Sequence, residues 1–269
     1  MVSKLSLSRR DMLAGGLTAG VAACAPGALL ARIEDVAYAI SQDFGRIEPL
    51  PGGIDIDLPT HSDAGTVVPL TISMPGQLTP EAYPKLIRLY GSENPRPRIA
   101  SLSFTPQCGQ AFFSTRIRLQ GAQNVVAVAE NADGTFNRED RKVTVAFGAC
   151  AAAGNSDDLP EDWQPQIRLS VPKTASAGEI VDIRTIITHP METGLRLNAT
   201  TQYVPRRIIE SMTCLMDGVQ VFRAKLEPAI STNPFIAFKL RIDRSCRLTF
   251  DWVDTNGSTY HREAEVVVS

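Results

Sequence analysis

The sequence has 269 residues, of which 43% are hydrophobic, 6% aromatic and 21% charged, and its formal net charge is −2. This profile excludes a disordered chain, a collagen and a protein that crosses a membrane several times, and the length suits two domains of about 110 residues. The 27 basic and 29 acidic residues are nearly balanced, so we expect no nucleic-acid-binding surface. The five cysteines include no CxxC pair, which argues against a structural zinc site.

Residues 1–31 have the features of an export signal. Residues 8–13, SRRDML, resemble a twin-arginine signal, with Met12 at the position where that pattern usually has Phe. No charged residue follows until Arg32, but four glycines and a proline make this stretch a poor permanent membrane span. We therefore expect export to the periplasm by the twin-arginine route, with a general secretory signal as the alternative.

Cys24 adds a second alternative for the leader. It follows residues 21–23, VAA, which resemble the lipobox of bacterial lipoproteins. Cleavage before Cys24 would leave a lipid-anchored protein, whereas cleavage near Ala31 would discard the cysteine. The protein is therefore expected at a membrane only if Cys24 is lipidated.

From residue 32 the chain begins with a helix and then changes to strands. The apolar spacing of residues 33–40 predicts a short amphipathic helix that ends near Gly45. Short runs with alternating polarity follow, separated by turn residues such as those at 75–76 and 133–134. The predicted strands are residues 54–58, 67–74, 85–90, 99–104, 111–119, 124–129 and 142–147. Strands of this length and spacing indicate an antiparallel β-sandwich over residues 32–150.

A linker and a second strand series complete the chain. Residues 151–163 are first small and then acidic, with little to bury, and are expected to form an interdomain linker. Asp217-Gly218 and Asn256-Gly257 predict hairpin turns. The predicted strands are residues 167–171, 180–188, 208–216, 219–226, 235–242, 247–253 and 261–268. The fold class is therefore all-β, with a second sandwich over residues 164–269.

Motifs typical of enzymes and metal sites are missing from the sequence. It contains three histidines and no HExxH, GxSxG or phosphate-binding loop. His189 is followed by Pro190-Met191, but a lone His-x-Met needs further soft or imidazole ligands, and its neighbourhood offers none. We therefore expect neither a metal site nor a cofactor, and no enzymatic activity of the chain itself.

Cys150 is the most distinctive residue of the sequence. It lies three residues past the last predicted strand of the first half, on an arm made of Gly148, Ala149 and Ala151. A thin segment of this kind can enter a narrow active-site channel, and the distance from the strand to Cys150 is about 10 Å at 3.3 Å per residue. A free thiol is a liability in an oxidising compartment, which favours a use for it over an incidental cysteine.

The remaining cysteines leave alternatives open. Cys246 is in phase with Leu248, Phe250 and Trp252 and should face the core, where Cys214 could approach it. These two cysteines either form a disulfide or remain buried free thiols. A pair of Cys108 with Cys150 would instead indicate a redox protein.

Several stretches resemble a known family. Residues 142–150, KVTVAFGAC, resemble the carboxyl end of SoxY, the sulfur-carrying subunit of the bacterial thiosulfate-oxidising (Sox) system, which ends in a Gly-Gly-Cys-Gly arm. Residues 114–119 and 124–129 look like SoxY core strands. The second half resembles SoxZ at residues 171–175, 188–196, 205–209 and 228–238. The chain therefore looks like a fused SoxYZ carrier of the type associated with quinoprotein dehydrogenases.

The resemblance implies a fold, a function and partners. It implies immunoglobulin-like sandwiches in both halves and a periplasmic carrier that holds sulfur intermediates on Cys150. The implied partners are a haem enzyme that loads the arm, a hydrolase that removes sulfate and a sulfur dehydrogenase, or a quinoprotein dehydrogenase system. The arm departs from the family because it reads Gly-Ala-Cys-Ala and lies within the chain. The alternative is a non-catalytic periplasmic adaptor whose Cys150 is incidental or redox-active.

Overall fold

The fold is built almost entirely from strands, with one short helix at its beginning. The computed structural model describes residues 35–148, 159–160 and 163–269, and within these the one α-helix is α1 (Val36–Phe44). The side chain of Asp35 accepts a hydrogen bond from the backbone N–H of Ala37 at 2.8 Å and caps the helix. Gly45, with φ of 72°, ends it. The predicted helix is therefore confirmed, and no helix in the described part is long and apolar enough to cross a membrane.

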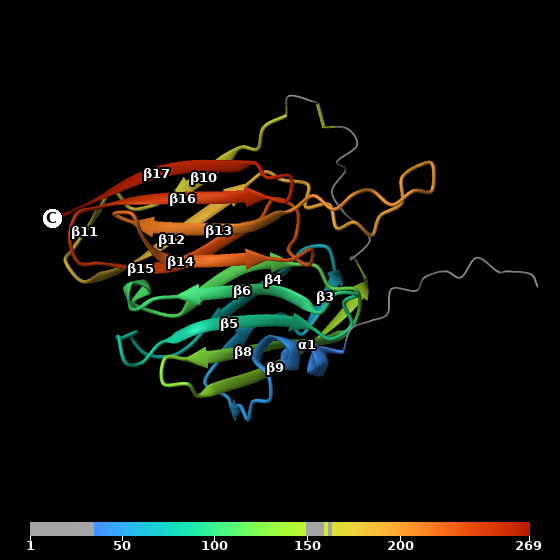
Figure 1. Cartoon of the computed structure of the whole chain (residues 1–269), viewed down its shortest axis with the longest axis horizontal. Coiled ribbons are helices and arrows are strands. Elements are labelled where there is room, and N and C mark those ends of the chain that lie inside the picture. The colour runs from blue at the N-terminus through green and yellow to red at the C-terminus, as the bar shows by residue number, and fades with distance from the viewer. Residues whose placement is uncertain (1–34, 149–158, 161–162) are drawn as a thin grey trace, which may run out of the picture. The chain divides into compact units, whose positions relative to one another are not determined.

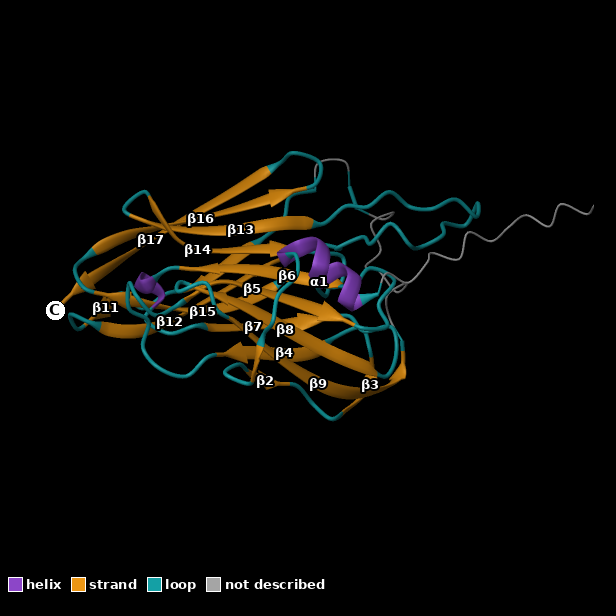
Figure 2. Cartoon of the chain, turned by 60° about the horizontal axis from the view of Figure 1, so that its bottom comes forward, coloured by secondary structure: helices purple, strands orange, loops and turns teal. Residues whose placement is uncertain are grey.

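Asp43 ties α1 to the sheet on which it packs. Its carboxylate accepts hydrogen bonds from the Tyr90 hydroxyl at 2.8 Å and from Arg98 Nε at 2.9 Å, and pairs with Arg88 Nη1 at 2.6 Å. Burial raises the pKa of Asp43, but the combined hydrogen bonds from Arg98, Tyr90 and Arg88 outweigh burial and hold this pKa below its ordinary value. The helix therefore covers the outer face of one sheet (Figure 2).

The first half contains every strand that the sequence predicts, together with two further short ones. The strands of this half are β1 (Leu50–Pro51), β2 (Asp55–Asp57), β3 (His61–Ala64), β4 (Val68–Ser73), β5 (Pro84–Gly91), β6 (Arg98–Phe104), β7 (Phe112–Ile117), β8 (Gln123–Asn131) and β9 (Phe136–Phe147). A 3₁₀ turn, η1 (Pro106–Cys108), follows β6. The strands not predicted, β1 and β3, both pair in parallel with β9.

The second half also contains every strand that the sequence predicts. Its strands are β10 (Ile167–Ser170), β11 (Thr174–Ala175), β12 (Glu179–Ile187), β13 (Ile209–Met216), β14 (Val219–Leu226), β15 (Phe235–Ile242), β16 (Cys246–Asp254) and β17 (Thr259–Val268). At the turn between β13 and β14, Asp217 and Gly218 have positive φ values of 50° and 82°. This is the conformation that an Asp-Gly hairpin requires.

Both sheets run through the two halves of the chain (Figure 1). The larger sheet has the order β1-β9-β8-β5-β6-β14-β13-β16-β17-β11, with β3 beside β9, and the smaller has the order β10-β12-β15-β7-β4-β2. Strand β6 pairs antiparallel with β14, and β7 pairs antiparallel with β15. The all-β sandwich is confirmed, and the halves share both of its layers.

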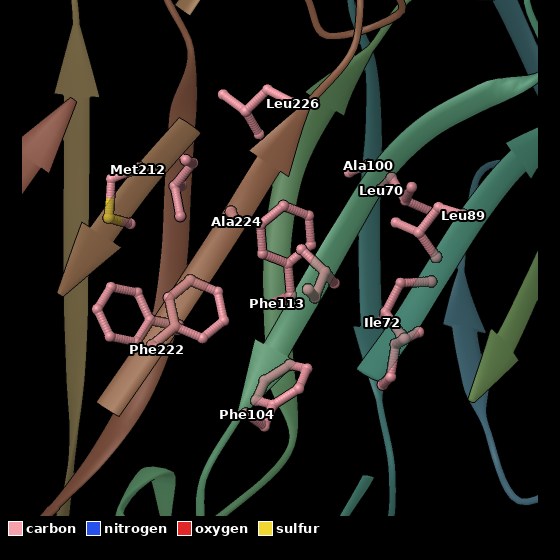
Figure 3. Packing of buried hydrophobic residues seen from close by; sticks show 14 of the residues in the cluster. Leu70, Ile72, Leu89, Ala100, Phe104, Phe113, Met212, Phe222, Ala224 and Leu226 are labelled. Carbon is pink, nitrogen blue, oxygen red and sulfur yellow. The ribbon is translucent and has the colours of Figure 1, made fainter. Parts of the chain in front are cut away.

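Aromatic side chains fill the core where the halves meet (Figure 3). The ring of Phe222 stacks on Phe238 with 4.3 Å between centroids and meets Phe104 edge-on at 5.3 Å. Phe113 lies 6.4 Å from the same ring. Because Phe104 and Phe113 come from the first half and Phe222 and Phe238 from the second, one hydrophobic core serves both halves.

Candidate functional site at the root of the cysteine arm

The structure describes the cysteine arm up to Gly148, the residue that follows β9. Ala149, Cys150 and Ala151 lie outside the described residues, as do Cys24 with the rest of the leader and most of the expected linker. The site that can be built is therefore the arm root, by which we mean Phe147 and Gly148 together with Gly65 and Gln120, which hold them.

The end of β9 is held by a parallel neighbour. Strand β3 aligns Ala64 with Phe147, and the N–H of Gly65 donates to the carbonyl of Phe147 at 2.7 Å. The carbonyl of Gly65 in turn accepts from the N–H of Leu119 at 2.8 Å. These bonds fix the backbone of β9 up to the residue before the arm.

At two positions of the arm root, a neighbouring backbone carbonyl lies so close that only glycine fits. A Cβ atom on Gly148 would collide with the carbonyl oxygen of Gln120, and one on Gly65 would collide with the carbonyl oxygen of Leu119. The sequence analysis identifies Gly148 as part of a thin arm, but the local sequence does not indicate that residue 65 must also be glycine. Both positions accept only glycine, because another segment of backbone occupies the space of a side chain.

Asn94 fixes the loop against which Gly148 packs. This residue is 1% exposed, and its Oδ1 accepts from the N–H of Gln120 at 3.0 Å and from Gln123 Nε2 at 3.1 Å. Its Nδ2 donates to the carbonyl of Arg118 at 3.1 Å. The arm root is therefore a rigid platform, since a buried and hydrogen-bonded side chain supports its floor.

Arg118 joins the arm root to the second half. Its side chain is 1% exposed and donates from Nη1 to the carbonyls of Met191 at 2.7 Å and Pro228 at 3.2 Å. Met191 has a positive φ of 52°, and its N–H donates to His189 Nδ1 at 3.1 Å. Pro190 and Met191 of the second half therefore contact the first half through Arg118.

A second cluster surrounds Trp163 near the start of the second half. His189 Nε2 and Arg207 Nε both lie beside Asp254 Oδ2, at 3.1 and 3.3 Å. Burial raises the pKa of Asp254, but hydrogen bonds from His189 and the N–H of Asn256 contribute to a net lowering of this pKa. The ring of Trp163 lies 6.0 Å from that of His189, with Arg207 5.5 Å from the Trp163 centroid. We call these four side chains (Trp163, His189, Arg207 and Asp254) the Trp163 anchor.

The other cysteines are buried in the core. Cys108 is fully buried, and burial raises its pKa to about 12. Cys214 and Cys246 are free cysteines, so the disulfide considered for them is not formed. Cys214 lies opposite Phe250, and Cys246 is four residues further along the strand, about 13 Å at 3.3 Å per residue. A disulfide needs Cα atoms within about 7 Å. Leu248, Phe250 and Trp252 are fully buried, as predicted.

The described residues at the arm root offer no catalytic machinery. The imidazole of His61 on β3, which pairs in parallel with β9, is exposed and contacts Asp63 at 3.1 Å. No group of three or more His, Cys, Asp or Glu side chains that could hold a metal ion occurs within the described ranges. Within the described residues, the root fixes the backbone position from which the arm begins.

Comparisons with known proteins assign each half separately. The family model described as "Sulfur oxidation protein SoxY" matches residues 40–150, and "Sulphur oxidation protein SoxZ" matches residues 167–265. Among solved structures, the sulfur carrier protein SoxY from Chlorobium limicola f thiosulfatophilum is 27% identical, over 41% of this chain and 96% of that one, with a TM-score of 0.36. A superoxide reductase (neelaredoxin) from Ignicoccus hospitalis is 15% identical, over 35% and 80%, with a TM-score of 0.32. No curated protein sequence matches the chain.

Proposed function

The chain is a fused SoxYZ-like protein, with a SoxY half followed by a SoxZ half, and on that premise we propose that it carries sulfur intermediates covalently on Cys150. The observation that supports this residue most directly is the extent of the SoxY match, which ends at residue 150. Position 150 is a cysteine, two residues beyond the rigid arm root. In this proposal the thiol is carried on a short arm that begins at the arm root.

The proposed loading step is an oxidation. The Cys150 thiol loses its proton and its sulfur joins the sulfane sulfur of the thiosulfate dianion in an S–S bond, while two electrons pass to an oxidising partner. Hydrolysis then breaks the bond between the sulfane sulfur and the sulfonate. The oxygen of water joins the sulfonate, which leaves as sulfate with release of one proton, and the other proton of water stays on the persulfide of Cys150. The partners that these steps need are a haem enzyme and a hydrolase, and a sulfur dehydrogenase or a quinoprotein dehydrogenase system would oxidise what remains.

The chain itself contributes presentation and not activation. No His, Lys or Arg is adjacent to Cys150 in the sequence, and a thiol with an ordinary pKa near 8.5 is only about 3% thiolate at pH 7. The thiol is therefore activated inside the partner enzyme.

We further propose that the protein is exported. The leader residues Arg9 and Arg10 and the uncharged stretch that follows support a periplasmic protein delivered through the twin-arginine route, with lipidation at Cys24 as the variant that would keep it at the membrane. The fusion removes the need for two separate chains to associate, a step that costs several kcal/mol of lost translational and rotational freedom.

Intact mass spectrometry tests this function. Protein isolated from its own cells after growth on thiosulfate should carry sulfur or thiosulfonate adducts, and peptide mapping should place them on Cys150. The Cys150→Ser variant should carry none and should unfold at the wild-type denaturant concentration. Cys246→Ser is the matched control and should be loaded as the wild type is. Adducts that persist in Cys150→Ser would overturn the assignment to Cys150, because another residue would then carry the cargo. A wild-type Cys150 that is never modified would favour the adaptor alternative.

A further inference from the structure

Large apolar side chains are exposed at the arm root. Phe147 is 77% exposed although it is the last residue of a rigid strand, and Val67, two residues beyond Gly65, is 49% exposed. The carbonyl of Phe147 is fixed by its hydrogen bond from Gly65. The position of this aromatic residue therefore does not depend on the arm.

A two-stranded ribbon between β12 and β13 exposes a second apolar pair. Glu192 and Arg207 exchange backbone hydrogen bonds of 2.8 and 3.0 Å at its base. The Glu192 carboxylate also accepts from Arg196 Nη2 at 2.9 Å. Near the tip, Leu197 and Tyr203 form an isolated bridge and are 50% and 67% exposed. The ribbon is thus held by backbone pairing at its base and near its tip, and its apolar side chains Leu197 and Tyr203 are exposed to solvent.

Strand directions place both apolar pairs at one end of the sandwich. Successive antiparallel pairings from β9 through β8, β5 and β6 make β14 run in the same direction as β9. Strand β13 is antiparallel to β14 and therefore begins where β9 ends. Figure 1 shows the ribbon projecting from the end of the molecule at which β9 finishes. We call this the arm end.

We infer that Phe147, Val67, Leu197 and Tyr203 form a contact surface for the enzymes that act on Cys150. This inference rests on the proposed carrier function. The occupant is an enzyme whose thiol-modifying centre is recessed behind an apolar rim. Because one residue separates Gly148 from Cys150, the sulfur stays within about 10 Å of the arm root. An enzyme that encloses this sulfur therefore approaches the arm root, where Phe147 is exposed.

The chemistry of the surface fits such an enzyme. Exposed aromatic side chains on rigid backbone are the typical anchors of protein interfaces, because they bury a large area at little entropic cost. The polar pair His61 and Asp63 on the adjoining strand β3 is exposed, as the rim of an interface usually is. The arm then supplies the substrate, while the arm-end surface supplies recognition.

The loading rate of surface variants tests the inference. Full-length protein is incubated at low concentration with thiosulfate and a periplasmic extract of the source cells, and the Cys150 adduct is followed by intact mass. Phe147→Ser should lower the initial loading rate at least tenfold, and Tyr203→Ser should lower it to a smaller extent. Val219→Ser is the matched control, because Val219 is 68% exposed and begins β14 at the opposite end. A small thiol reagent should modify Cys150 equally fast in every variant.

The outcomes separate this inference from the function on which it rests. If the wild-type chain gains no adduct on Cys150, the carrier function fails and the contact surface with it. If wild type and both aromatic variants load at equal rates, the carrier stands and the contact surface is overturned. Equal loss of rate in Val219→Ser would also overturn it, because the effect would then not depend on the arm end.

Discussion

Replacing Phe222 by alanine should destabilise both halves of the protein together. Phe222 is fully buried and contacts aromatic rings from each half, Phe238 at 4.3 Å and Phe104 at 5.3 Å. Truncating a buried phenylalanine costs about 3–5 kcal/mol, since it removes buried surface and leaves a cavity. In urea, followed by circular dichroism, Phe222→Ala should unfold in one transition at a lower midpoint, as a shared core requires.

The same variant should weaken the contact between the halves after the chain is cut. With a protease site placed between residues 151 and 158, the wild-type halves should co-elute on size exclusion at micromolar concentration, because both sheets cross the junction. A loss of 3–5 kcal/mol corresponds to an affinity weaker by about two to three and a half orders of magnitude, so the Phe222→Ala halves should separate on dilution.

Phe250→Ala is the control for this experiment. Phe250 is also fully buried, but its ring stacks on Trp252 within the second half, on a strand separated from β14 by β13. It should lower stability by a similar amount while the cut halves keep nearly the wild-type affinity. The shared core would be refuted if Phe222→Ala unfolded in two separate transitions, or if both variants weakened the contact equally.

Three further changes have defined outcomes. Asp43→Asn should lower the free energy of unfolding at pH 7 and make it less dependent on acid pH. The pKa of Asp43 is lowered in the folded protein, so its contribution to stability is present above the unfolded-state pKa near 3.9 and is lost as pH falls through the folded-state pKa. Urea unfolding from pH 7 to 2 measures this. Gly148→Ala should displace the arm root from the Gln120 carbonyl and lower the free energy of unfolding by about 1–3 kcal/mol. Native Cys108 and Cys214 should resist alkylation at pH 8, since burial raises both thiol pKa values, and should react once urea unfolds the chain.

Each of these expectations can fail in a specific way. An unchanged acid profile in Asp43→Asn would mean that other carboxylates govern acid unfolding. Wild-type stability in Gly148→Ala would mean that the close backbone approach is relieved at no cost, and Gly121→Ala is its control because no atom lies within 4 Å of a Cβ built there. Rapid native labelling of Cys108 or Cys214 would mean that the core opens far more readily than its packing indicates.

Much of the fold could be predicted because most strands have one buried face. In β16, Leu248, Phe250 and Trp252 alternate with more exposed residues, and this period of two identifies a strand from local sequence. The first half of β9 lacked that signal, since residues 137–141 are polar or charged. The strand β3 was missed for the same reason, because it is held by pairing with β9 and not by an apolar face.

The candidate site could be predicted less completely, because its geometry depends on distant segments. A local pattern identifies Cys150 and its small neighbours, but the need for Gly65 comes from a carbonyl in the loop after β7. Likewise, nothing in the local pattern of β6 or β14 specifies that they pair with each other across the halves. Such long-range register is encoded by the complementarity of two surfaces, which periodicity does not report.

The fixed arm root constrains how enzymes can share the proposed carrier. Cys150 lies two residues after Gly148 and so stays within about 10 Å of the arm root, which means that the thiol cannot travel between two enzymes seated at separate places. Each enzyme must occupy the same position and then leave before the next arrives. The slowest dissociation therefore sets an upper limit on the flux through the whole reaction sequence. Natural selection on such a carrier would favour short residence times over tight binding.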